Sequence, residues 1–372
     1  MRRLQLATVY LGGFIGPFAG QSVAVILPNV ARTFSITIEQ AALTVSAYLF
    51  PFATVMLFST RIVQNLRPRR VIMTAYTVTF LGSLVCLLST SWALFLVGFT
   101  TMGLANAFTL PVFQIMLREI VPARHLGEAL DTYAAMQSFG LFSSPLISGL
   151  ATLVGWQYLY LIVTAAALWV LIIKVPDIPP PGATESAGTG RRLWWPVILH
   201  CCACLMMGIR VIGMAPLTAL SVGERFDASA VGRGAVIMCG GLTAFFLARP
   251  LGALVDRAGP KTILLACATA SAVAMALLPI VPHPALVAAG WAVAVFATQG
   301  MQTCINLSML RTPGGASLLS TVQAFRFYGP SITPVLLMPV YLSSANWAFW
   351  IPALMMVSAF ALELKNPAWK KN

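Results

Sequence analysis

Charged residues are scarce in this sequence. Asp, Glu, Lys and Arg together make up only 9% of its 372 residues, whereas a soluble globular domain has about one quarter. There are 10 acidic residues and three histidines, so metal sites and acid–base catalytic clusters have few possible members. Because 59% of the residues are hydrophobic, water is not the solvent for most of the protein's surface.

Motifs of enzymes are also lacking. The chain has no His-Glu-x-x-His and no Gly-x-Ser-x-Gly, and the run 259–262 (GPKT) imitates only the end of a nucleotide-binding loop. Cys201, Cys202 and Cys204 lie near His200, but neighbouring helix positions point in different directions and cannot converge on one ion. We therefore expect no catalytic residue, no metal and no cofactor.

Long apolar runs dominate the rest of the chain. A helix that crosses the hydrocarbon core of a bilayer needs about 20 mainly apolar residues. The first run, 4–30, exceeds the roughly 7 to 15 apolar residues of a signal peptide, so we interpret it as a retained helix. Twelve spans are predicted, over residues 5–29, 41–61, 71–89, 92–117, 128–153, 157–174, 194–222, 229–248, 261–281, 285–310, 316–342 and 346–364.

The spans form two similar halves. A Pro-, Gly- and Ser-rich stretch separates them, which predicts domains at 1–175 and 194–372 with a cytoplasmic linker at 176–193. The runs 61–70 and 252–261 both join the second span of a half to the third, at an offset of 191 residues. The predicted fold class is therefore an all-α membrane protein made of two pseudo-symmetric six-helix bundles.

Basic residues predict the orientation of the spans. All but five of the 23 Lys and Arg residues fall on one side of the predicted membrane, and basic residues collect in cytoplasmic loops. This places both termini in the cytoplasm, with the protein in a plasma membrane of the bacterial inner-membrane type. The same dispersal over short loops argues against nucleic-acid binding, despite a net charge of +13.

One loop motif resembles a known family. The run 252–261 (GALVDRAGPK) is similar to the loop between the second and third helices of a half in the major facilitator superfamily. The N-terminal copy has Asn65 where the family has Asp, and Pro68 where it has Gly. The resemblance implies twelve helices, alternating access to a central site, and a gate formed by Gly252, Asp256, Arg257, Gly259, Lys261, Asn65, Arg69 and Arg70.

Two further runs resemble the exporter branch of that family, the drug or metabolite:proton antiporters. The run 140–149 is similar to the antiporter motif through Gly140, Ser144, Pro145 and Gly149, although ordinary packing of small residues is the alternative. The run 25–34 is similar to the end of the first helix of these exporters. However, Ala19 stands where many of them have an acid, and Gly98 where they commonly have a membrane arginine.

Ionisable groups inside the spans are the main candidates for a binding site, because burying a charge in a membrane is costly. Arg326 and Arg210 lie there, and we hypothesise that one or both bind an anionic substrate. The alternative is that Arg210 reaches the outer interface and that Arg326 bonds to backbone carbonyls or nearby glutamines. The full set of candidate substrate-binding residues is Arg326, Arg210, Gln299, Gln302, Asn106, Gln137 and Gln21, with Gln137 as the counterpart of Arg326.

Proton coupling has weaker candidates. Asp131 could exchange protons, but we favour its pairing with Arg118 or Arg124. We interpret His200 as a packed residue in preference to a proton carrier. We therefore expect a monomeric transporter, in contact with membrane lipid, that exports a small drug-like or anionic metabolite in exchange for protons. Import or uncoupled passage of an organic anion is the first alternative, and a non-transporting receptor or assembly protein of the same fold is the second.

Overall fold

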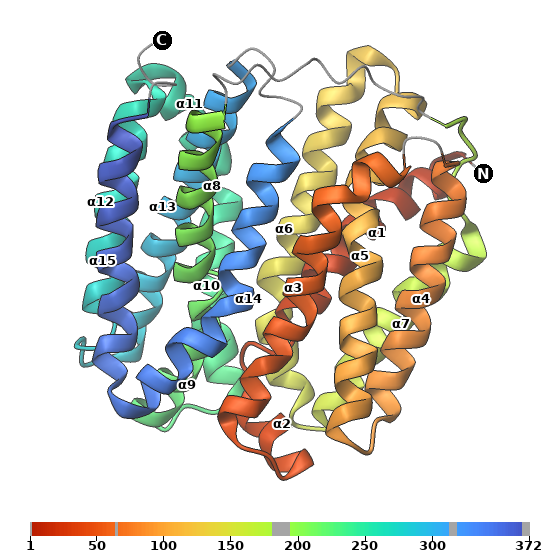
Figure 1. The fold of residues 1–372 in the computed structure, drawn as a ribbon. Coiled ribbons are helices and arrows are strands. Elements are labelled where there is room, and N and C mark those ends of the chain that lie inside the picture. The colour runs from red at the N-terminus through yellow and green to blue at the C-terminus, as the bar shows by residue number, and fades with distance from the viewer. Residues whose placement is uncertain (1, 64–65, 181–193, 312–317, 367–372) are drawn as a thin grey trace. The chain divides into compact units, whose positions relative to one another are not determined.

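The computed structural model describes residues 2–63, 66–180, 194–311 and 318–366 (Figure 1). These residues form helices joined by turns, with no β-strand in the described ranges. The chain divides into two compact units, Met1–Thr184 and Glu185–Asn372. That boundary falls in a stretch outside the described residues, so the predicted linker at 176–193 stays a prediction.

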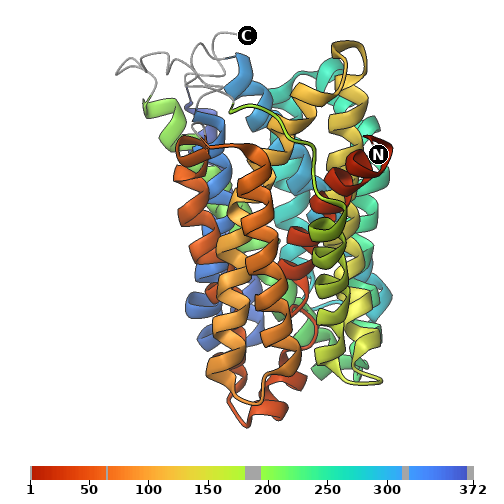
Figure 2. The same cartoon turned by 90° about the vertical axis from the view of Figure 1, so that its right-hand side faces the viewer.

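Unit 1 is a helical bundle in which α1 packs on α6, and α4 runs beside α5 (Figure 2). Local signals fix where its helices start. Pro68 occupies the first position of α4, the Ser91 hydroxyl accepts the Leu94 N–H at the start of α5, and Thr37 and Gln40 form a reciprocal capping box at the start of α3. The helices are α1 (Arg2–Gln21), α2 (Leu27–Phe34), α3 (Ile38–Val63), α4 (Pro68–Leu88), α5 (Trp92–Ile120), α6 (Leu126–Ala151) and α7 (Leu159–Ile173), with short 3₁₀ turns at Ala123–His125 and Trp156–Tyr158.

Unit 2 repeats this plan, with α8 packed on α14, α15 and α13. Ser229 caps α10 by accepting the Gly232 N–H, and Gly259 separates α11 from α12 with a φ of 83° that side-chain-bearing residues rarely adopt. The helices are α8 (Trp194–Arg210), α9 (Met214–Phe226), α10 (Ala230–Phe246), α11 (Ala248–Ala258), α12 (Pro260–Leu277), α13 (Pro284–Arg311), α14 (Leu319–Ser343) and α15 (Ala345–Leu364).

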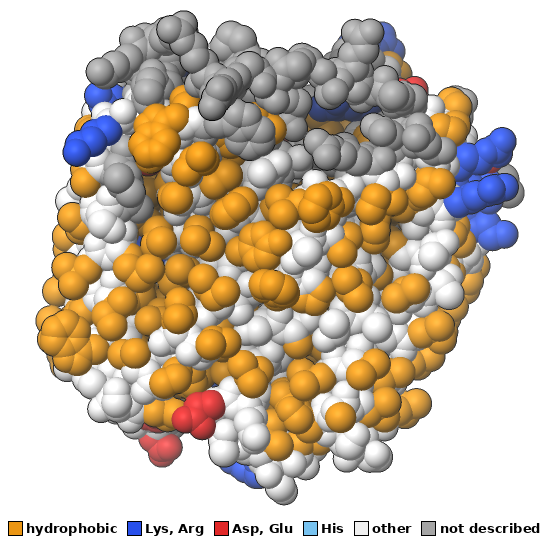
Figure 3. All heavy atoms as spheres, in the orientation of Figure 1, with side chains coloured by type: hydrophobic (Ala, Val, Ile, Leu, Met, Phe, Trp, Pro, Cys, Tyr) orange, Lys and Arg blue, Asp and Glu red, His pale blue; other side chains and the backbone are white. Residues whose placement is uncertain are grey.

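Each of the twelve predicted spans coincides with helix in the described residues. Seven helical segments there are long and apolar enough to cross a membrane, so the chain is a multi-pass membrane protein, while the count of twelve crossings stays a prediction. Large apolar side chains such as Leu88, Leu153 and Val154 are exposed. The face drawn in Figure 3 is accordingly mostly hydrophobic, as expected where lipid replaces water.

The first predicted span of each unit is interrupted, which the apolar pattern does not reveal. Between α1 and α2, the N–H groups of Ser22, Ala24 and Ile26 bond to carbonyls three residues back instead of four. Between α8 and α9, the Gly213 N–H bonds to the Gly208 carbonyl at 3.0 Å, five residues back. Such broken helices are tolerated at membrane depth where the protein itself surrounds them.

Close backbone contacts join the same helix pair in both units. A Cβ on Gly140 of α6 would lie 2.4 Å from the Phe14 carbonyl oxygen of α1. A Cβ on Gly329 of α14 would lie 2.4 Å from both the Ile209 nitrogen and the Leu205 carbonyl oxygen of α8. Gly140 and Gly329 each follow the proposed counterparts Gln137 and Arg326 by three residues. In both units, therefore, the glycine at this position is where two helices touch.

We expect Gly140→Ala to destabilise the protein, because its methyl group would meet backbone that cannot move aside. Overpacking of this kind costs about 1–3 kcal/mol. Gly127→Ala is the matched control in the same helix, since a Cβ there has nothing within 4 Å. Thermal unfolding in detergent should show a lower midpoint for Gly140→Ala and an unchanged or higher one for Gly127→Ala; equal midpoints would contradict the tight contact.

Candidate functional site

Unit 1 is closely packed at the two positions where the resembled exporters have ionisable residues. A Cβ on Gly98 of α5 would lie 2.8 Å from the Gly82 carbonyl oxygen of α4, so the two helices meet backbone to backbone and leave no room for an arginine. Ala19, where many exporters have an acid, is fully buried in α1. Neither position provides an ionisable group.

Asn106 is the best-connected candidate of unit 1. Its side-chain nitrogen donates to the Tyr48 hydroxyl at 2.9 Å, and that hydroxyl donates to the Gly16 carbonyl at 3.1 Å, which ties α5 to α3 and α1. The Asn106 side-chain oxygen is buried without a hydrogen-bond partner. Gln21 and Gln137 are half-buried, and their side chains make no hydrogen bond to any residue that the structure describes.

Unit 2 gathers its polar candidates along the contact of α8, α13 and α14. Thr298, Gln302 and Asn306 follow one another at four-residue spacing, so they share one face of α13. We call the set that meets there the polar seam, and it consists of Arg210, Thr298, Gln302, Asn306, Gln323 and Arg326.

Arg210 ends α8 at the helix break and is fully buried. One terminal nitrogen, Nη2, donates to the Thr298 hydroxyl at 2.8 Å, whereas Nε and Nη1 have no partner among the described residues. The alternative that Arg210 reaches the outer interface is therefore wrong. A buried guanidinium with one neutral partner is costly by itself, so its unused donors are available to an anion.

Amide groups connect α13 to α14 in the middle of the seam. Gln302 donates from Nε2 to the Asn306 side-chain oxygen at 2.9 Å, and Gln323 donates to the same oxygen at 2.7 Å. The Cys204 thiol approaches Gln302 Oε1 at 3.9 Å from α8. Gln302 is therefore occupied within the protein, while Gln299, one turn earlier, is half-buried and its side chain makes no hydrogen bond to a described residue.

Arg326 lies three residues after Gln323 on α14 and is half-buried. Its backbone rests on α8, where a Cβ on Gly208 would lie 2.0 Å from the Arg326 carbonyl oxygen. Within the described ranges, its guanidinium makes no hydrogen bond or ion pair, and Nε is buried without a partner. The predicted alternative partners, backbone carbonyls, Gln299 and Gln302, are therefore not used.

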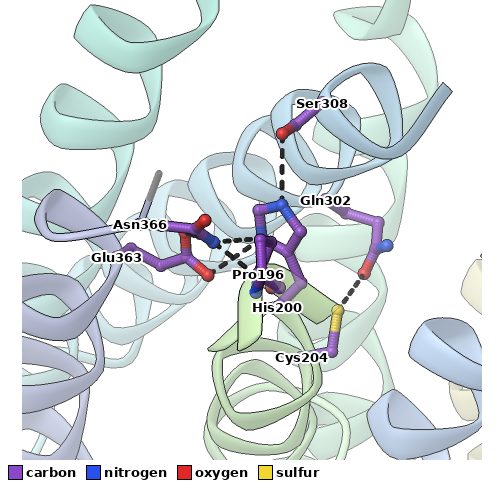
Figure 4. Close-up of polar contacts among 7 residues, drawn as sticks. All are labelled: Pro196, His200, Cys204, Gln302, Ser308, Glu363 and Asn366. Carbon is purple, nitrogen blue, oxygen red and sulfur yellow. Dashed lines mark hydrogen bonds and ion pairs between the residues drawn. The ribbon is translucent and has the colours of Figure 1, made fainter. Parts of the chain in front are cut away.

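A second polar cluster lies toward the start of α8, and sequence reasoning missed it (Figure 4). His200 Nδ1 lies 2.9 Å from Glu363 Oε1 of α15, and His200 Nε2 lies 3.1 Å from the Ser308 hydroxyl of α13. Asn366 donates to Glu363 Oε2 at 3.2 Å. A histidine and a glutamate 163 residues apart give no local signal, so only the fold could show that they pair.

The gating motif of unit 2 is more helical than expected. We predicted a loop over 252–261, but α11 continues through Ala258, and the chain leaves the helix at Gly259, which takes a positive φ. Arg257 and Lys261 are exposed and make no ion pair with any residue that the structure describes. Asn65, and the side chains at positions 252 and 256, lie outside the described residues.

In the N-terminal copy of the motif, the ion pair is made by an arginine outside the predicted set. Arg67 lies 3.6 Å from Asp177, with both side chains about half exposed. Arg69 is half-buried and Arg70 is exposed. An exposed pair of this kind contributes about 0–1 kcal/mol, and the gating role of Arg69 and Arg70 stays a prediction.

The antiporter-like motif forms the contact between α6 and α1. The Ser144 hydroxyl donates to the Phe18 carbonyl at 2.7 Å, Pro145 lies within α6, and Gly149 is buried. Asp131, at the exposed end of the same helix, makes no ion pair with Arg118 or Arg124. The pairing favoured from sequence is therefore wrong.

The Arg210–Thr298 contact predicts an asymmetry between two substitutions. Thr298→Val removes the partner of a buried charge and should lower stability by about 1–3 kcal/mol. Arg210→Met removes the charge itself and should raise stability by about 1–4 kcal/mol, as replacing a buried charge by an apolar side chain often does. Thermal unfolding of both variants and of the double variant tests this asymmetry. If Thr298→Val lowers stability as much in the Arg210→Met background as in the wild-type protein, the loss of stability does not come from the Arg210–Thr298 contact.

Comparison with known proteins agrees with this architecture. The model of the Major Facilitator Superfamily matches residues 9–309. The MFS-type transporter TOXA of Cochliobolus carbonum is 27% identical over 175 residues, which cover 47% of this chain and 32% of TOXA. The purine ribonucleoside efflux pump NepI of Escherichia coli is 28% identical over 164 residues, which cover 42% of this chain and 40% of NepI.

These matches span about a third to two fifths of the relatives' own lengths. The crystal structure of the human organic anion transporter MFSD10 (TETRAN) aligns with 97% of this chain and 99% of its own, with a TM-score of 0.73 and 15% identity. The fold is therefore shared with a solved transporter of this type, and the family model covers most of the sequence. The chain belongs to the major facilitator superfamily.

Proposed function

We propose that this protein exports a small organic anion by alternating access, in exchange for protons. The observation that carries the proposal is the state of Arg326 and Arg210. Both lie inside membrane helices of unit 2, both have buried N–H groups without a partner, and neither forms an ion pair with a described carboxylate. An anionic group on the substrate would supply the missing acceptors through charge-assisted hydrogen bonds.

The polar seam suits an organic anion better than a simple ion. Gln323 lies one turn before Arg326 on α14 and bonds to Asn306 of α13, and these amide groups can orient a second polar group on the substrate. Gln299, also in unit 2, has a side chain that bonds to no described residue, so we propose it as a further substrate contact there. In unit 1, the Asn106 side-chain oxygen and the side chains of Gln21 and Gln137 likewise have no hydrogen-bond partner among the described residues, and we propose them as candidate substrate contacts of that unit.

Export is favoured by two likenesses. The run 140–149 resembles the antiporter motif and packs α6 against α1, and NepI is named an efflux pump. MFSD10 is named an organic anion transporter, which agrees with the charge of the seam. We further propose a monomer in a plasma membrane of the bacterial inner-membrane type, with cytoplasmic termini, because basic residues gather on one predicted side.

Uncoupled passage of the same anion is the second candidate. It is favoured by the packing at Gly98, which leaves no room for the arginine that exporters use, and by the buried Ala19. The two candidates differ in one respect: a coupled exporter uses a pH gradient to move its substrate against a concentration difference, and an uncoupled one does not.

The proposal predicts flux of an organic anion through purified protein in proteoliposomes. Carboxyfluorescein, inosine and ethidium serve as anionic, neutral and cationic probes, with empty liposomes as the baseline. We expect carboxyfluorescein to move, and to accumulate when a pH gradient is imposed. Movement of inosine or ethidium alone would contradict the anion proposal. Carboxyfluorescein flux that does not depend on the pH gradient would favour uncoupled passage.

Arg326→Gln and Arg210→Gln test the two arginines in the same assay. A hydrogen bond to a charged group contributes about 1.5–3 kcal/mol, so we expect KM for carboxyfluorescein to rise about ten- to hundredfold. Arg124→Gln is the matched control, because Arg124 is an exposed arginine outside the seam. An unchanged KM in Arg326→Gln would remove Arg326 from the site.

A further inference from the structure

We propose that His200 and Glu363 form a proton-binding site that is loaded and unloaded during the transport cycle. This proposal deepens the proposed antiport, since it names the groups that would exchange the proton. It rests on geometry within unit 2 alone, and it places the proton apart from the anion site at Arg326.

The pair has the composition that reversible proton binding needs. His200 is 0% exposed and Glu363 is 2% exposed, and their side chains meet at 2.9 Å between α8 and α15. With one proton shared between them the two side chains carry no net charge, and without it they carry one buried negative charge. Gain or loss of that proton therefore changes the electrostatic energy inside the bundle far more than it would on the surface.

The surroundings hold the pair in place from three helices. Ser308 of α13 lies 3.1 Å from His200 Nε2, and Asn366, just after α15, donates both to Glu363 Oε2 and to the Pro196 carbonyl of α8 (Figure 4). A change in the charge of His200 or Glu363 thus alters how firmly α8 is held to α13 and α15. Helix pairs that meet on small side chains, as α8 and α14 do at Gly208 and Gly329, are suited to small sliding motions.

Other titratable groups lie on α8 and on the helices packed against it. The Cys201 and Cys204 thiols of α8 and the Cys304 thiol of α13 belong to one buried cluster of unit 2. On α14, the cation is Arg326. Among these groups, histidine is the one that ordinarily changes charge near neutral pH.

A short chain of contacts joins the proton site to the polar seam. Cys204 lies one helical turn after His200 and approaches Gln302 Oε1 at 3.9 Å, and Gln302 donates to Asn306. Ser308 is two residues beyond Asn306 on the same helix. A shift of α8 caused by protonation would therefore reach the amide groups beside Arg326, which is the route by which proton and anion could influence each other.

The first test is an infrared pH titration of the full chain in nanodiscs, which needs no substrate. The carboxyl and imidazole bands should show a protonation step that is lost in Glu363→Gln and in His200→Gln. The matched control is the exposed pair His125–Glu128, with side chains 55% and 82% exposed and 3.7 Å apart, so Glu128→Gln should keep the step. A spectrum in which the step survives Glu363→Gln, or vanishes in Asp131→Asn instead, would overturn the proposal.

The second test separates coupling from folding. In proteoliposomes, Glu363→Gln should lose accumulation of carboxyfluorescein driven by a pH gradient, yet keep exchange of internal for external carboxyfluorescein at zero gradient, because exchange needs no net proton movement. Exchange and gradient-driven flux that fall together would contradict a coupling role. If the wild-type protein moves no carboxyfluorescein at all, the proposed anion export fails, while the titration still decides the proton site.

Discussion

A charge inside a membrane-spanning bundle must be neutralised, and this constraint organises the polar interior of the protein. Water is absent from the hydrocarbon region, so each buried ionisable group needs a partner from the chain or from a ligand. His200 and Glu363 meet this need by pairing with each other. Arg210 meets it only in part, through Thr298, and the guanidinium of Arg326 has no partner among the residues described. The His200–Glu363 pair is therefore a site that the protein completes by itself, whereas the site at the two arginines is one that a substrate would complete.

Glycine contacts set where these groups can lie. Gly140 and Gly329 bring α6 onto α1 and α14 onto α8, and the break in the first helix of each unit lies beside the same contacts. Because Arg326 precedes Gly329 by three residues and Arg210 follows Gly208 by two, the two arginines are held near the closest approach of α8 and α14. At Gly98, by contrast, the approach of α4 and α5 excludes a side chain altogether. Close approach of two helices thus positions the two arginines in unit 2 and excludes a charged side chain at position 98 in unit 1.

The fold was largely predictable because it depends on features that short stretches of sequence carry. Apolar runs of the length of a bilayer located helices along the described residues of both units. The breaks after Gln21 and Arg210 were missed, since a helix interrupted by one turn keeps its apolar pattern. The motif at 252–261 was assigned to a loop on resemblance, although α11 continues to Ala258.

The candidate site was less predictable because contacts between distant residues decide it. Single arginines in spans could be recognised, but whether Arg210 would point outward or inward depended on α13 offering Thr298. The pairing of His200 with Glu363 depended on α15 returning to α8, which no local pattern encodes. Asp131 lacks the partner expected for it, because no described arginine pairs with it. Gln302 bonds to Cys204 and Asn306, contacts that its place in the sequence does not indicate.

The central claim is that the guanidinium groups of Arg326 and Arg210 receive an anion, and equilibrium binding tests it most directly. Fluorescence anisotropy of carboxyfluorescein, titrated with the protein in nanodiscs, should show saturable binding that is weakened in Arg326→Gln and retained in Arg124→Gln. Binding of equal strength in both variants, or its absence from the wild-type protein, would contradict the claim.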